Sequence, residues 1–91
     1  MGIEYRLRFD APDAAAVAAV LRRVPGASKA HAQEDSIDLV ATPFGQPQAT
    51  VQAEPGGAYF CDHCGGSGRA LLGEVVAHLA SAFGAVIVEE L

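Results

Sequence analysis

Apolar and charged residues alternate strictly at the start of the chain, from residue 3 to residue 10. A period of two places the apolar side chains on one face of a β-strand and the charged side chains on the other. The segment therefore predicts a strand with one buried face and one open face. The apolar positions are Ile3, Tyr5, Leu7 and Phe9, and the charged positions are Glu4, Arg6, Arg8 and Asp10.

The apolar spacing then changes to that of a helix. Asp10 or Ala11 is the expected N-cap, with Pro12 in the first helical turn. Pro25-Gly26 is the expected stop, because proline and glycine interrupt helices. The apolar stripe of this predicted helix consists of Val17, Val20, Leu21 and Val24.

Between residues 27 and 61, short apolar alternations are separated by polar, proline-rich and glycine-rich breaks. Such breaks supply the backbone angles that hairpin loops need, so the pattern favours three or four antiparallel strands. The expected strands are Ala27–Ala32, Ile37–Thr42, Ala49–Ala53 and Ala58–Cys61.

A second helical period runs from Leu71 to Phe83, with Ser67 as its expected N-cap and Gly84 just after its last turn. Residues 85–91 predict a final strand. The consecutive residues Val86, Ile87 and Val88 are typical of a strand covered on both sides.

The resulting order, β-α-β-β-β(-β)-α-β, predicts an α+β fold. We expect a ferredoxin-like two-layer sandwich, in which a mainly antiparallel sheet of five to six strands carries both helices on one face. The chain of 91 residues is expected to form one domain, 1–91. An uncovered sheet face and an apolar content of 51% predict a homodimer.

The net charge and the apolar pattern of the chain indicate which classes of partner it can bind. The net charge of −5, from 11 acidic against 6 basic residues, argues against nucleic acid, which is bound by clustered Lys and Arg. No apolar run approaches the ~18 residues of a membrane helix, and the start lacks a basic segment followed by an apolar one. We expect a cytoplasmic protein whose partner is itself or another protein, with no membrane.

Cys61 and Cys64 form a Cys-x-x-Cys pair. Two cysteines at this spacing can coordinate one Zn²⁺, or they can form a small disulfide in a dithiol redox site. A structural zinc site needs two further ligands. His63 lies between the two cysteines, and that position disfavours its completing the same tetrahedron. The alternative is two reduced thiols that the fold does not require.

A glycine-rich segment follows, and it resembles the turn that opens the CoA-binding helix of acetyl-CoA-dependent N-acetyltransferases. Gly66 and Gly68 match the two glycines of that family's pattern, and His63 stands where the family has Arg or Gln. The resemblance implies that backbone N–H groups at a helix start hold an anion, the CoA pyrophosphate. The structural alternative is an ordinary glycine-rich connection. The implied anion site consists of Gly65, Gly66, Ser67, Gly68 and Arg69.

No complete catalytic or cofactor motif accompanies these segments. The leading interpretation is therefore a small, non-catalytic binding domain that associates with itself and carries no cofactor. One alternative is an acyl-CoA-dependent transferase that binds CoA at the glycine-rich turn. The second alternative is a zinc-binding or dithiol redox protein that uses Cys61 and Cys64.

Overall fold

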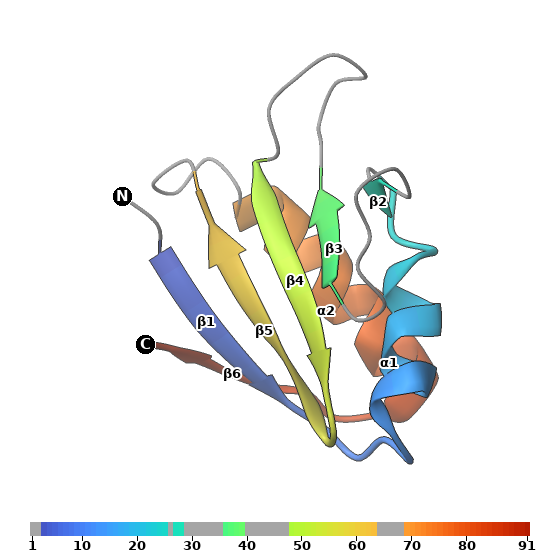
Figure 1. The fold of residues 1–91 in the computed structure, drawn as a ribbon. Coiled ribbons are helices and arrows are strands. Elements are labelled where there is room, and N and C mark those ends of the chain that lie inside the picture. Colours follow the sequence, from blue (N-terminus) through green and yellow to red (C-terminus); the bar gives the residue numbers. More distant parts are fainter. Residues whose placement is uncertain (1–2, 26, 29–35, 40–47, 64–68) are drawn as a thin grey trace.

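Strands and helices follow one another as β1–α1–β2–β3–β4–β5–α2–β6 in the computed structural model (Figure 1). The structure describes residues 3–25, 27–28, 36–39, 48–63 and 69–91. The strands are β1 (Ile3–Arg8), β2 (Ala27–Ser28), β3 (Ser36–Leu39), β4 (Ala49–Glu54), β5 (Gly57–Asp62) and β6 (Ile87–Glu90), and the helices are α1 (Ala14–Leu21) and α2 (Arg69–Phe83).

The strands described form one sheet in the order β2-β3-β4-β5-β1-β6, and each neighbouring pair is antiparallel. The first strand therefore lies inside the sheet, between β5 and β6. The α+β class, the antiparallel sheet and the two packed helices are confirmed. Within the described residues, the sheet reaches the upper end of the predicted strand number.

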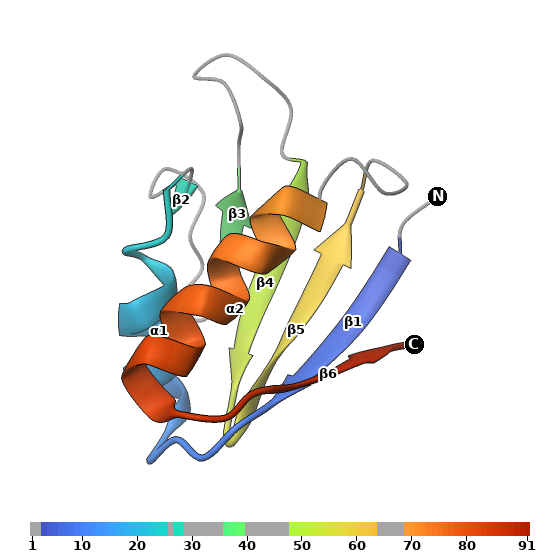
Figure 2. The same ribbon diagram turned by 180° about the vertical axis from the view of Figure 1, so that it is seen from behind.

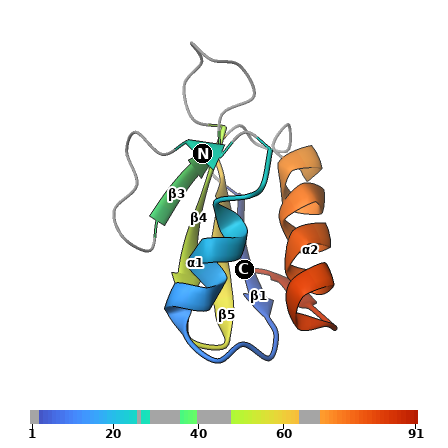
Figure 3. The ribbon, with the colours of Figure 1, turned by 90° about the vertical axis from the view of Figure 1, so that its right-hand side faces the viewer.

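Both helices and one side of the sheet contribute to a single core. Figure 2, which views the molecule from behind, shows α2 lying across the sheet, and Figure 3 shows the sheet edge-on with α1 in front of it and α2 to one side. The opposite face of β1, β5 and β4 has no described helix over it, as Figure 1 shows. The largest fully buried apolar side chains are Phe60, Leu7, Leu21, Leu79, Val17, Val51 and Val75.

The first helix begins later than the sequence predicts. Asp13 is its N-cap, because its Oδ1 accepts a hydrogen bond of 2.8 Å from the N–H of Ala16. Neither Asp10 nor Ala11 caps the helix, and Pro12 precedes it instead of lying in its first turn. The helix ends at Leu21, so the turn that follows begins before Pro25.

The second helix agrees with the prediction at its C-terminal end. Gly84 has a φ of +90°, and its N–H donates to the carbonyl of Ala80. This left-handed residue after the last turn is the cap that the sequence indicates. The predicted N-cap, Ser67, lies outside the described residues.

The last strand differs most from expectation. It forms the edge of the sheet and pairs with β1 alone among the described strands. Ile87 is 60% exposed, Val88 43% and Leu91 61%, so the prediction of a strand covered on both sides is wrong for this chain. A run of β-branched residues indicates a strand, but it does not distinguish a central strand from an edge strand.

Among the helices that the structure describes, neither is long and apolar enough to span a bilayer.

Candidate functional site on the uncovered face of the sheet

Side chains on the uncovered face fall into three rows, because residues paired across antiparallel strands share a face. Read from β1 through β5 to β4, the rows are Arg8–Gly57–Glu54, Arg6–Tyr59–Gln52 and Glu4–Cys61–Thr50. The edge strand adds Ile87 beside Arg8 and Glu89 beside Arg6.

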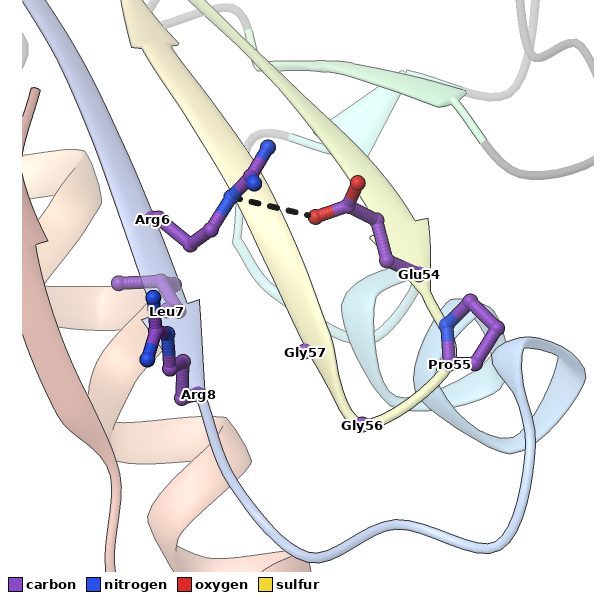
Figure 4. Close-up of a pocket in the computed structure, with 7 residues that line it drawn as sticks. All are labelled: Arg6, Leu7, Arg8, Glu54, Pro55, Gly56 and Gly57. Carbon is purple, nitrogen blue, oxygen red and sulfur yellow. Dashed lines mark ion pairs between the residues drawn. The ribbon is translucent and has the colours of Figure 1, made fainter.

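A hollow of about 410 Å³ lies at the end of this face where β4 turns into β5 (Figure 4). It forms at the row in which Gly57 contributes no side chain between Arg8 and Glu54. A Cβ at Gly57 would collide with the backbone carbonyl oxygen of Leu7, so β1 and β5 approach too closely here for any other residue. The hollow is lined by Arg6, Leu7, Arg8, Glu54, Pro55, Gly56 and Gly57.

The arginines at this end are paired diagonally with acids. Arg6 Nε lies 3.7 Å from a carboxylate oxygen of Glu54, and Arg8 Nε lies 3.1 Å from one of Glu89. The first distance is too long for a hydrogen bond, and Arg6 Nε, although shielded from solvent, has no hydrogen-bond partner in the described part of the chain. The Arg6 guanidinium carbon also lies 5.9 Å from the Tyr59 ring centroid, within cation–π range.

Tyr59 links the middle row to Glu4. Its hydroxyl donates a hydrogen bond to the Glu4 carboxylate. This bond, with burial and the negative charge of Glu4 as smaller causes, raises the pKa of Tyr59 to about 12. The phenol is therefore neutral and serves as a donor at physiological pH.

At the other end of the face, three polar side chains form a chain of contacts. Cys61 Sγ lies 3.7 Å from His63 Nδ1, and His63 Nε2 lies 2.8 Å from Thr50 Oγ1. The two ring nitrogens of His63 therefore face a thiol and a hydroxyl, and each of these groups can donate or accept a hydrogen bond, so either tautomer of the imidazole satisfies both contacts.

The backbone holds His63 in this position. Its N–H donates to the carbonyl of Gln48 over 2.9 Å, which extends the β4–β5 ladder one residue beyond Asp62. Residues two apart in an extended strand share a face, so His63 and Cys61 lie on the same side while Asp62 is buried on the core side.

Cys61 carries a free, half-buried thiol. Burial raises the pKa of this thiol above its ordinary value, and the negative charges of Glu4 and Asp62 raise it further. The thiol is therefore protonated at neutral pH, which does not suit it to the thiolate chemistry of a dithiol redox centre.

The structure separates the site residues predicted from the sequence. Cys61 is on the uncovered face, and Arg69 is the exposed first residue of α2. Cys64, Gly65, Gly66, Ser67 and Gly68 lie outside the described residues, so the anion site and the two-cysteine metal site stay predictions. Within residues 3–25, 27–28, 36–39, 48–63 and 69–91, no three His, Cys, Asp or Glu side chains are grouped to hold a metal ion.

Sequence reasoning missed Glu54, Tyr59 and Thr50, and it treated Arg6 and Arg8 only as part of a solvated sheet face. Their contacts depend on which strands are neighbours and in which register. The contact of His63 with Cys61 could have been predicted from their spacing in the sequence, since residues two apart in a strand share a face. The predicted strand, Ala58–Cys61, ends two residues before His63 and therefore did not include this contact.

Comparison with known proteins finds no matching family model, no matching curated protein and no matching solved structure.

Proposed function

We propose that this chain is a non-catalytic binding domain that associates with a second copy of itself through the outer edge of β6. The observation that carries the proposal is that the exposed large apolar side chains of the described residues all lie at this edge: Ile87, Val88 and Leu91.

A strand edge presents backbone N–H and C=O groups that have no partner inside the molecule. Proteins usually protect such an edge with charged residues or cover it. Here β6 combines an outer edge that pairs with none of the described strands and a β-branched run that is typical of a buried strand. A second β6 would satisfy both features, because antiparallel pairing adds backbone hydrogen bonds and places apolar side chains opposite one another.

The uncovered face fits this role less well. Its arginines already have acidic neighbours, Glu54 and Glu89, and Tyr59 already donates to Glu4. Desolvating paired charges costs free energy that apolar residues do not require. Self-association is therefore assigned to the edge rather than to the open face.

The charges near the edge select a register. A two-fold axis at Val88 would place Val88 opposite its copy and Ile87 opposite Glu89 of the second copy. Arg8 lies beside Ile87 and already contacts Glu89 within one molecule, so each Glu89 would keep a cation nearby. A register that placed the two Glu89 residues opposite each other would bring like charges together.

This contact is small, because one short strand and three apolar side chains form it. Fully burying an Ile, Val or Leu side chain contributes roughly 1.5–3 kcal/mol, and association loses much of that gain to lost translational and rotational freedom. We expect a weak dimer, with a Kd on the order of 1–100 µM.

Sedimentation equilibrium from about 1 to 300 µM tests the proposal, because this range brackets the expected Kd. Wild type should change from monomer to dimer, whereas Ile87→Lys with Val88→Lys should remain monomeric. Ala77→Lys with Ala82→Lys is the matched control, since it adds the same two charges at exposed positions of α2. A wild type that stays monomeric throughout, or a double variant that dimerises as well as the control, contradicts the proposal.

We also infer that the architecture is ferredoxin-like with two added strands. The four strands β4, β5, β1 and β6 are adjacent in that order, α1 follows β1, and α2 joins β5 to β6; this arrangement supports the inference. The added strands, β2 and β3, extend the sheet beyond β4. A cytoplasmic location accompanies the proposal, because it would keep the thiol of Cys61 reduced.

A further inference from the structure

We propose that the hollow beside the β4–β5 turn binds a small molecule through a single carboxylate group, which Arg6 and Arg8 hold. The two guanidinium groups supply the hydrogen-bond donors, and the glycines of the turn leave room for the ligand. This site lies on the uncovered face of the sheet, whereas the sequence suggests an anion site at residues 65–69. It does not require a second copy of the chain.

The turn provides the space. Figure 4 shows Arg8 on one side of the hollow and Pro55 on the other, with Gly56 and Gly57 between them. These two glycines contribute no side chain, and the close approach of the Leu7 carbonyl excludes one at Gly57. The volume of about 410 Å³ falls in the range of pockets that hold small molecules, about 300–1,000 Å³.

The lining has an excess of hydrogen-bond donors. A guanidinium group carries several N–H donors and no acceptor. Among the residues that line the hollow, Glu54 brings a carboxylate against the two guanidinium groups of Arg6 and Arg8. Glu89 contacts Arg8 through Nε, but it does not line the hollow. A ligand that brings acceptor oxygens would therefore complement this lining.

Arg6 can turn toward such a ligand without losing a hydrogen bond at Nε. This nitrogen is shielded from solvent, lies 3.7 Å from a carboxylate oxygen of Glu54 and has no hydrogen-bond partner in the described part of the chain. A shielded donor without a partner costs free energy. Rotation of the side chain toward a carboxylate in the hollow would give Nε the acceptor that it lacks.

The charges of the lining favour a carboxylate over a phosphate. Arg6, Arg8 and Glu54 together leave a single excess positive charge. One carboxylate balances this charge, whereas a phosphate monoester, at about −1.5 to −2 near pH 7, would exceed it and would lie beside Glu54. A carboxylate also matches the paired, parallel N–H groups of a guanidinium. The ligand class is therefore a monocarboxylate.

An NMR titration of the ¹⁵N-labelled full chain tests the proposal at constant ionic strength. Sodium benzoate is the carboxylate probe, benzamide is its uncharged counterpart, and inorganic phosphate represents the competing chemistry. Benzoate should shift the Nε–H signals of Arg6 and Arg8 and the amide signals of Gly56 and Gly57, with a Kd on the order of 0.1–10 mM for a small, open site. Phosphate should bind more weakly, and benzamide should leave these signals unchanged.

Substitutions in the lining should change the affinity for benzoate in opposite directions. Arg6→Gln should weaken binding about 10-fold, the usual cost of losing a hydrogen bond between charged groups. Glu54→Gln should strengthen binding, because it removes the acid that competes for Arg6. Arg23→Gln and Glu74→Gln are the matched controls, since they make the same charge changes at exposed positions outside the lining.

Four results would each overturn the proposal. They are a wild type without shifts at the hollow, benzamide binding as strong as that of benzoate, phosphate binding tighter than that of benzoate, and lining variants that bind benzoate as their controls do. Circular dichroism shows whether each variant keeps the fold. Arg8→Gln is the second arginine variant, and it should also weaken binding.

Discussion

The two faces of β1 hold the molecule together in different ways. On the core face, Tyr5 and Leu7 are buried, and the Tyr5 ring meets Phe60 edge-on at 6.1 Å between centroids. On the uncovered face, Arg6 and Arg8 contact acids on two other strands. The same six residues thus alternate between close packing and solvent-accessible ion pairs.

The two faces of β1 therefore contribute differently to the stability of the fold. Each buried apolar side chain contributes a few kcal/mol, whereas an exposed ion pair contributes about 0–1 kcal/mol. The core face therefore carries most of the stability of β1. The uncovered face is free to vary its chemistry along the strand, from the arginine-lined hollow at one end to the thiol and imidazole at the other.

Neighbouring substitutions on β1 test the comparison most directly. Leu7→Ala should lower the free energy of unfolding by about 2–5 kcal/mol, because Leu7 is fully buried and its truncation leaves a cavity. Arg8→Ala should change it by no more than about 1 kcal/mol. Urea denaturation of both variants measures the two effects. Losses of similar size would show that the two faces do not differ as the structure indicates.

Gly57, on the uncovered face, provides the next test. Gly57→Ala should cost about 1–3 kcal/mol, because the added methyl group would force β5 away from the Leu7 carbonyl. Gly73→Ala is the matched control: a Cβ there meets nothing within 4 Å, and alanine favours a helix by about 0.5–1 kcal/mol over glycine. Thermal unfolding of both should show opposite signs. A neutral Gly57→Ala would contradict the close approach of the strands.

The parts of the fold that follow from local periodicity could be predicted. The alternation in β1 and the helical spacing in α2 are each visible within one segment of sequence. The start of α1 was predicted wrongly, at Asp10 or Ala11, because the sequence does not show which side-chain oxygen reaches a backbone N–H; in the structure the Asp13 carboxylate accepts from that of Ala16. The exposure of β6 depends on its position in the sheet, which its own residues do not encode.

Less of the candidate site could be predicted, because its contacts join distant segments. Arg6 meets Glu54 only if β1 and β4 flank β5 in one register, and Arg8 meets Glu89 only if β6 lies beside β1. Cys61 was recognised because its motif is local. Its partners His63 and Thr50 required the ladder to continue past the predicted strand end.

The smallest expected effect concerns the one phenol on the uncovered face. Glu4→Gln should lower the pKa of Tyr59 from about 12 toward 10, because the hydrogen bond to Glu4 is the largest cause of the shift and the charge of Glu4 adds to it. Tyr5 is the other tyrosine, so a Tyr5→Phe background makes Tyr59 the sole reporter. Alkaline titration of tyrosinate absorbance measures the change.

The same shift sets a pH dependence. Folding raises the pKa of Tyr59, so the fold favours the neutral phenol: its contribution to stability is complete below about pH 10 and is lost as pH rises through about 12. Denaturation at pH 9 and near pH 11, as approximate points on either side of the unfolded-state value, should show a decline in the Tyr5→Phe background that Glu4→Gln reduces. Because the Tyr59 side chain is only half-buried, we expect the decline to be small. An equal decline in stability in both proteins would show that other titrating groups cause it and that the Glu4–Tyr59 contact does not contribute.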